Sequence, residues 1–275
     1  MSALRSLILA AASVPLLGVA SSTLHAFEFS GLALGISVGN LIAAHGSPEV
    51  LTTDVGQIWT WDSSGGTVRI TTDDRGIVQV IDVLPAPEGP VSFALPSQPP
   101  LIVNFGMTTE HEADLRYGPM AAFSASTRFP DSGAAADVRG YRFSGSRQAV
   151  LLFENTSKTL REVFYGDTDN LAYAGFLPAS PVTKTQFTAP VLVHRGSSDY
   201  PRTKKQGDAF VRIEVDAGGS VSQSTIFTSS GDLDLDRSAI ASANSFTFTP
   251  ATRDGVAVPA VFFDKETFRK SPSKR

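Results

Sequence analysis

The part of the chain that most constrains its fold lies near the C-terminal end. Two runs that alternate, or nearly alternate, apolar and polar residues, 210–216 and 221–227, flank the pair Gly218 and Gly219. Strands of this pattern pair as a β-hairpin when glycine supplies the positive φ of the tight turn between them. The sequence therefore predicts a β-hairpin over residues 210–227.

A helix and a last strand are predicted to follow the hairpin. Apolar residues recur at helical spacing at Leu235, Ala239, Ile240 and Ala243. Ser230 or Asp232 can cap this helix, and Asp234 and Asp236 fall in its first turn, where the helix dipole favours negative charge. After a turn at residues 253–255, the apolar residues 258–263 predict the final strand.

These elements carry short motifs in a fixed order. The motifs are Tyr200-Pro201, Val211 to Asp216, Gly219, Ser229-Ser230-Gly231, Leu235-Asp236 with Ala239, Phe248-Thr249-Pro250-Ala251, and Asp254-Gly255 with Val258. In this order they resemble the C-terminal domain of the TonB family, over residues 191–270. Many family members have Trp just before the Phe-x-Pro motif, where this chain has Phe246 or Thr247. The resemblance implies an exported, non-enzymatic protein-binding adaptor that acts in transport or energy transduction across the cell envelope.

The resemblance also implies a partner-binding edge. Domains that take up an extended segment as an extra strand use the unpaired edge of a sheet. The final strand is the candidate, because Pro259 cannot donate to a sheet ladder and fits an edge better than a central strand. The expected partner is a TonB-dependent outer-membrane receptor or another envelope protein. The predicted contact residues are Tyr200, Pro201, Val258, Pro259, Val261, Phe262 and Phe263.

Residues 1–26 are typical of a secretory signal peptide. Arg5 precedes an apolar run over residues 7–20, and the small residue Ala26 stands at the expected cleavage site. The run is shorter than the roughly 20 residues that a membrane-spanning helix needs. We therefore expect export to the periplasm with cleavage before Phe27. The alternative is an uncleaved segment that anchors the chain in the inner membrane.

The region between the signal peptide and the TonB-type domain is predicted to contain two similar modules, residues 27–84 and 101–174. Each has a short helix followed by strands, which makes the predicted fold class α+β with antiparallel meanders. The strands are expected at residues 58–61, 67–71 and 77–83 in the first module and at 141–143, 149–153 and 160–165 in the second.

The two module helices have recognisable ends. Ser37 is expected to cap the first, and Thr109 and Glu112 have the spacing of a capping box at the start of the second. Both helices are expected to stop at a glycine that proline soon follows. In the second helix, Leu115 is placed on the apolar side.

The first module carries a second, weaker set of motifs: Gly35-Ile36-Ser37, His45-Gly46-Ser47-Pro48, Trp59 with Trp61, and Arg75-Gly76-Ile77-Val78. These are similar to the small outer-membrane lipoprotein fold of the BamE type, which also occurs as a tandem pair in β-lactamase inhibitor protein. The resemblance implies an alternative function as a periplasmic inhibitor or an assembly scaffold.

Two stretches rich in proline, serine and threonine are predicted to be linkers, residues 85–100 and 175–190. Proline fixes φ and lacks an N–H, so the first stretch is expected to be stiff and to form no central strand. The second is expected to separate the modules from the domain that begins at residue 191.

Catalytic and ligand-binding motifs are few. Residues 35–39 match the G-x-S-x-G nucleophile elbow, but no parallel sheet is predicted around it, so Ser37 is better interpreted as a helix cap. Asp232, Asp234 and Asp236 begin like a calcium loop, yet Arg237 and Ala243 stand where that loop needs Gly and Glu. We expect no cofactor and no metal. The net charge of −4 argues against nucleic acid as a partner.

Overall fold

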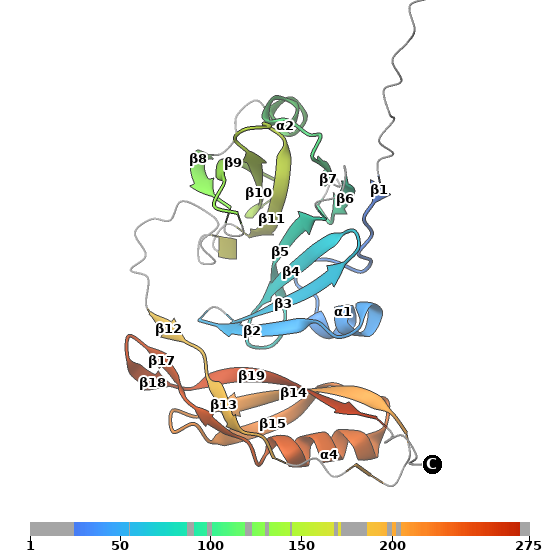
Figure 1. Ribbon diagram of the computed structural model, residues 1–275, viewed down its shortest axis with the longest axis vertical. Helices are drawn as coiled ribbons and strands as arrows, with labels where there is room; N and C mark the ends of the chain where they lie inside the picture. The colour runs from blue at the N-terminus through green and yellow to red at the C-terminus, as the bar shows by residue number, and fades with distance from the viewer. Residues whose placement is uncertain are drawn as a thin grey trace, which may run out of the picture.

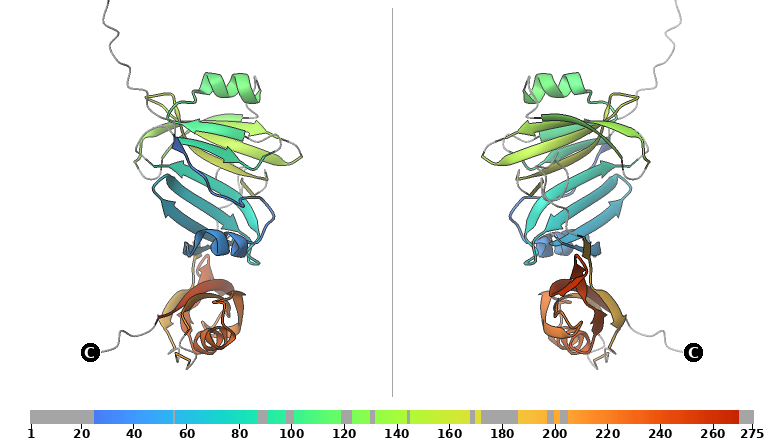
Figure 2. Two further views of the ribbon diagram at one scale, coloured as in Figure 1. Left: turned by 90° about the vertical axis from the view of Figure 1, so that its right-hand side faces the viewer. Right: turned by 90° about the vertical axis from the view of Figure 1, so that its left-hand side faces the viewer.

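A computed structural model shows an α+β protein in two parts that are stacked along its long axis (Figures 1 and 2). The N-terminal part extends to Leu171 and the C-terminal part begins at Gln186. The residues that the structure describes are 25–54, 56–86, 91–97, 101–118, 123–129, 132–143, 145–167, 170–171, 186–196, 200–201 and 205–269. The predicted signal peptide lies outside them, apart from His25 and Ala26.

The N-terminal part is built on an eight-stranded antiparallel sheet with the strand order β2-β3-β4-β5-β11-β10-β9-β8. Its strands are β2 (Glu49–Thr53), β3 (Gly56–Ser63), β4 (Gly66–Thr72), β5 (Val78–Pro85), β8 (Phe123–Arg128), β9 (Ala135–Arg142), β10 (Arg147–Glu154) and β11 (Leu160–Asp167). The two predicted modules therefore share one sheet, because β5 of the first pairs with β11 of the second. The prediction missed the outer strands β2 and β8.

The two halves of this sheet are related by an approximate two-fold axis between β5 and β11. The helix α1 (Val38–His45) precedes β2 and the helix α2 (Glu110–Tyr117) precedes β8, as predicted. Gly35 N–H donates to the Val78 carbonyl at 2.8 Å, and Gly106 N–H donates to the Leu160 carbonyl at 2.8 Å. The ladders β4–β5 and β10–β11 are both irregular at the same step, just after Val78 and Leu160. Val78 and Leu160 are thus equivalent positions.

A second, smaller sheet contains β1 (His25–Ala26), β6 (Val91–Leu95) and β7 (Leu101–Phe105), in the order β1-β6-β7. β6 lies inside the stretch predicted to be a linker without a central strand, and that prediction is wrong for these residues. Val91–Leu95 contains no proline, and its alternate residues Val91, Phe93 and Leu95 are buried. Burial of this apolar face outweighs the prolines on either side.

The predicted caps of α1 and α2 are confirmed, but the predicted buried face of α2 is wrong at Leu115. The hydroxyl of Ser37 accepts from Gly39 N–H, and Thr109 and Glu112 form a complete capping box. Leu115, however, is 74% exposed, so its predicted place on the buried side is wrong. α2 is instead held by polar contacts: Arg139 pairs with Glu110 at 2.7 Å, and the Tyr141 hydroxyl donates to Asp114 at 2.7 Å.

The C-terminal part contains the predicted hairpin and helix. β14 (Gly207–Val215) pairs with β15 (Val221–Thr228), and α4 (Leu233–Ala243) begins after the N-cap Asp232. The three-stranded sheet has the order β15-β14-β19, with α4 packed on one face (Figure 1). Short strands complete the part: β12 (Phe187–Thr188), β13 (Val191–His194), β16 (Thr247–Thr249), β17 (Ala251–Arg253) and β18 (Val256–Val258).

Two predicted boundaries shift in this part. The last strand, β19 (Ala260–Phe268), begins after Pro259, whereas Val258 belongs to β18 and pairs with Ala251 of β17. The turn predicted at residues 253–255 closes this extra hairpin, and the prediction had merged only its last residue, Val258, into the final strand. In addition, β12 lies within the second predicted linker and pairs with β17, so the C-terminal part includes residues before 191. Most of that linker lies outside the described residues.

A buried ionic cluster lies at the seam between the two sheet halves. Arg69 of β4 donates to Asp82 of β5 at 2.5 Å and to Glu162 of β11 at 2.6 Å. Both carboxylates are almost fully buried. Burial and the neighbouring Glu162 raise the pKa of Asp82 well above its ordinary value, against the opposing effect of Arg69.

Candidate protein-binding site

β19 is an edge strand with a regular ladder on one side. It pairs with β14 without a register shift from Ala260 to Phe268. Among the described residues, β14 is its one strand neighbour. An edge of this kind presents N–H and C=O groups to which another strand can be added.

One hydrogen bond shows which residues of β19 point away from β14. The hydroxyl of Thr52, on β2, donates to the carbonyl of Val261 at 3.2 Å. Alternate residues of an antiparallel strand direct their backbone groups to opposite sides. Val261, Phe263, Lys265 and Thr267 therefore share the outward orientation.

The predicted contact residues on this strand do not share one exposed surface. Val261 and Phe263 are 8% and 5% exposed, and Phe263 packs edge-on against Trp59 of β3 with 4.8 Å between ring centroids. Phe262 lies on the opposite face, where it contacts Phe248. The first half of β19 thus lies beneath the N-terminal part, with β2 beside it (Figure 1).

Tyr200 lies at the other end of β19. Its ring packs near that of Phe268, at 6.2 Å between centroids, and its hydroxyl donates to the carbonyl of Lys205. The eight residue steps from Ala260 to Phe268 span roughly 26 Å at about 3.3 Å each. Tyr200 and Pro201 are therefore remote from Val258 and Pro259, and the structure does not bring the predicted contact residues together.

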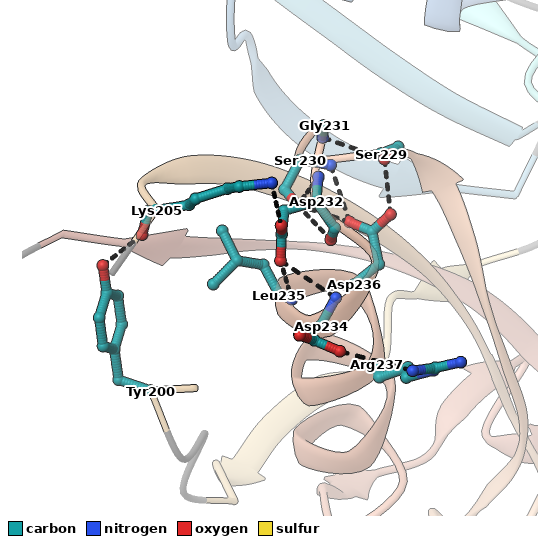
Figure 3. Close-up of polar contacts among 10 residues, drawn as sticks. All are labelled: Tyr200, Lys205, Ser229, Ser230, Gly231, Asp232, Asp234, Leu235, Asp236 and Arg237. Carbon is teal, nitrogen blue, oxygen red and sulfur yellow. Dashed lines mark hydrogen bonds and ion pairs between the residues drawn. The ribbon is translucent and has the colours of Figure 1, made fainter. Parts of the chain in front are cut away.

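The Ser-Ser-Gly motif forms the turn between β15 and α4, shown in Figure 3. The hydroxyl of Ser229 and both the N–H and the hydroxyl of Ser230 donate to the carboxylate of Asp236, at 2.5, 2.8 and 2.7 Å. Asp236 is itself buried at the start of α4. This motif therefore fixes the path of the chain into the helix, which is a structural role.

Asp232 connects the same turn to the segment after Tyr200. Its carboxylate accepts from the N–H groups of Asp234 and Leu235 and pairs with Lys205 at 2.8 Å (Figure 3). The hydrogen bond from Lys205 lowers the pKa of Asp232. The three aspartates that begin like a calcium loop thus have other partners, since Asp234 contacts Arg237.

An ionic cluster that the sequence did not indicate lies along the second half of β19. Arg195 pairs with Asp264 and Glu266, and Ser242 of α4 donates to Glu266 at 3.0 Å. Burial raises the pKa of Glu266. The cluster fastens the segment after β13 to β19, but its residues are far apart in sequence and form no motif.

The face of the C-terminal sheet opposite α4 is covered by the N-terminal part. Phe227 of β15 stacks on Trp59 at 5.9 Å and packs edge-on against Phe263 at 4.9 Å. A Cβ atom added to Gly76 would lie 2.5 Å from the Phe227 ring, so only glycine leaves room for it. Arg212 adds a hydrogen bond to the carbonyl of Asp74 at 2.9 Å. Trp59 is fully buried in this contact.

Ser37 lies at the border of the same contact and has the environment of a helix cap. Its hydroxyl accepts from Gly39 N–H at 3.2 Å. A Cβ on Gly39 would approach Thr228 and Phe227 of the C-terminal part. Of the two glycines that produce the nucleophile-elbow pattern, Gly35 has the left-handed backbone of the turn before α1, and a Cβ on Gly39 would lie at ordinary contact distance from the C-terminal part.

Within the described ranges, no group of three or more His, Cys, Asp or Glu side chains is arranged to hold a metal ion. No helix in the same ranges has the length and apolar character to span a membrane.

The comparisons with known proteins bear on the C-terminal part. Residues 199–264 match the family described as Gram-negative bacterial TonB protein C-terminal, which confirms that resemblance. No curated protein matches the chain significantly. The BamE-type resemblance of residues 28–167 stays a prediction.

Two solved structures are loosely similar. One is a cysteine-rich secretory protein from Staphylococcus aureus (13% identity, TM-score 0.37), and the alignment covers 53% of this chain and 48% of that one. The other is an extracellular protein containing an SCP domain from Bacillus anthracis (14% identity, TM-score 0.38, 65% and 57% covered). The alignments therefore span about half the length of these proteins, and at such scores they do not bear on function.

Proposed function

We propose that this chain is an exported envelope protein that binds another protein through the β19 edge of its TonB-type domain. The match of residues 199–264 to the TonB C-terminal family, on a sheet whose last strand is an edge, carries this proposal. The apolar N-terminal segment supports export to the periplasm. The partner is a TonB-dependent outer-membrane receptor or another envelope protein that presents an extended segment.

The second half of β19 is the part of the edge that is open to such a segment. Lys265 and Thr267 are exposed and point outward, whereas Val261 and Phe263 are covered. Backbone hydrogen bonds to the added strand supply the affinity, and side chains near Tyr200 supply selectivity. Binding of this kind needs no catalytic group.

The experiment places a photo-cross-linking residue at position 265 of the full chain in its native cell envelope. We expect one defined covalent adduct with an envelope protein. Thr267→Pro removes an outward N–H and should abolish the adduct without breaking the β14 ladder.

The matched control is Ser224→Pro on β15, the opposite edge of the same sheet. It should leave the adduct intact. The proposal fails if Thr267→Pro has no effect in a folded protein, or if both prolines abolish the adduct equally.

A further inference from the structure

We propose that the N-terminal part is a removable cover for the β19 edge, so that the whole edge becomes available only when this part separates from the TonB-type sheet. The inference rests on the proposed function, because it concerns access to the same edge. The two parts are in contact around Phe227 and Val261.

The cover occupies the first half of the edge directly. The Thr52 hydroxyl takes the outward carbonyl of Val261, and the Trp59 ring lies against Phe263. An added strand needs the same carbonyl. Trp59 covers the face of the sheet beside this edge, where it also contacts Phe210 and Phe227. A partner can therefore pair with the full length of β19 only if β2 and β3 move away.

The contact between the parts differs from the pairing within them. No strand of the N-terminal part is in a ladder with a described strand of the C-terminal part. Two hydrogen bonds across the contact run from the side chains of Thr52 and Arg212 to single carbonyl groups. The parts can thus separate without breaking a sheet, and separation exposes the apolar residues that they share in one core, Trp59, Phe210 and Phe263.

The N-terminal part also packs closely around the Phe227 ring. Phe227 lies over Gly76, close to Gly39, and against Trp59. By strand register and N-cap position, Lys158, His111 and Arg139 of the second sheet half are equivalent to Gly76, Gly39 and Trp59, and all three are basic. Gly76 is the point of closest approach, since a Cβ there would lie 2.5 Å from the Phe227 ring, so this surface fits the Phe227 ring closely.

The chain contains no cysteine, so single thiols report access to the edge without background. In the full chain, Val261→Cys should react with a maleimide at least 10-fold more slowly than Lys265→Cys. Adding Phe227→Ala to Val261→Cys removes the ring from the contact between the parts and should bring the reaction rate of the thiol at position 261 close to that of the thiol at position 265. Gly76→Ala, which approaches the same ring from the other part, should have the same effect.

Ala239→Cys reports the core beneath α4, where Ala239 is fully buried. It should stay unreactive when Phe227→Ala is added. The proposal is overturned if Val261→Cys reacts as fast as Lys265→Cys in the otherwise unchanged protein, or if neither Phe227→Ala nor Gly76→Ala accelerates it. It is also overturned if Ala239→Cys becomes reactive in parallel. Since no partner takes part, this result is independent of the cross-linking test.

Discussion

The two halves of the eight-stranded sheet have the same backbone plan and opposite surface chemistry at corresponding positions. The equivalence of Val78 and Leu160 makes Ile81 equivalent to Val163, three residues further along each strand. Ile81 pairs with Ile70, which pairs with Trp59. Val163 pairs with Leu151, which pairs with Arg139, so Trp59 and Arg139 are equivalent. The same alignment matches Gly76 with Lys158 and, from the N-caps, Gly39 with His111.

The half that carries the TonB-type domain therefore differs from the other half at these three pairs of equivalent positions. Gly76 and Lys158 even share a left-handed backbone, with φ of 75° and 58°. The first half offers a flat ring and two glycines, and it receives Phe227. The second offers basic side chains, of which Arg139 and Lys158 pair with Glu110 and Asp137. The backbone sets where a domain can dock, and the side chains decide whether it does.

The largest difference is expected at the strand position shared by Trp59 and Arg139. Trp59→Ala should lower the free energy of unfolding by about 3–5 kcal/mol, because it empties the centre of a packed contact. Arg139→Ala breaks a partly exposed ion pair and should cost about 1 kcal/mol. Urea unfolding followed by circular dichroism measures both. Equal losses would mean that the two halves are not distinguished at this position.

The turn position gives the next contrast. Gly76→Ala introduces a Cβ into a left-handed residue and against Phe227, and should cost about 1–3 kcal/mol. Lys158→Ala keeps the existing Cβ and loses an exposed ion pair, so its effect should stay within about 1 kcal/mol. Thermal unfolding of the two variants tests this. A harmless Gly76→Ala would show that Phe227 does not approach Gly76 closely.

The seam between the halves should give stability a pH dependence. The raised pKa of Asp82 means that its contribution is fully present below about pH 4 and is lost as pH rises through the folded-state value. Asp82→Asn removes this loss, so its stability relative to the unchanged protein should increase as pH rises. Asp232→Asn should show the opposite trend, because the pKa of Asp232 is lowered. Because its pKa is lowered, the pH dependence due to Asp232 lies below about pH 4. Denaturant midpoints from about pH 2 to pH 8 therefore distinguish the two.

Removing the helix caps should have the smallest effect on the free energy of unfolding, and the effect should be the same in both halves of the sheet. Ser37→Ala and Thr109→Ala each remove an N-cap and should each cost about 1 kcal/mol. Neither should abolish a chemical activity. Loss of an esterase turnover on Ser37→Ala, but not on Thr109→Ala, in a folded protein would revive the nucleophile interpretation.

Processing at the N-terminus is a separate expectation from the sequence. Cleavage before Phe27 would remove His25 and Ala26, which pair with β6, and would keep the Phe27 N–H bond to Ser92. N-terminal sequencing of the protein from a periplasmic extract should begin at Phe27. An intact Met1 in the membrane fraction would instead support an anchored chain.

Local signals were enough to predict the hairpin, the helices and their caps. Glycines at fixed places, cap residues such as Thr109 and Asp232, and alternating strands act within a few residues, so the sequence displays them directly. The TonB-type domain was found in the same way, through motifs that fix its turns. These include Ser229 and Ser230 at the start of α4.

What escaped prediction depends on contacts between distant segments. The prolines of residues 85–100 predict a linker, whereas β6 forms there because it pairs with β1 and β7. The site residues Val261 and Phe263 were expected at an open edge, yet Thr52 and Trp59 lie against them. Arg195 with Asp264 and Glu266 shows no pattern in the sequence. Such contacts depend on how whole sheets stack, which no local pattern encodes.

The most direct test of the account measures which half of the sheet carries the TonB-type domain. Strand register makes Ser126 of β8 equivalent to Thr52 of β2, since they pair with the equivalent residues Asp137 and Gln57. In the cysteine-free chain, Thr52→Cys with Val261→Cys should be joined within one molecule by a short thiol-to-thiol cross-linker. Ser126→Cys with Val261→Cys should not be joined. Efficient joining of the second pair, or failure of the first, would contradict the account.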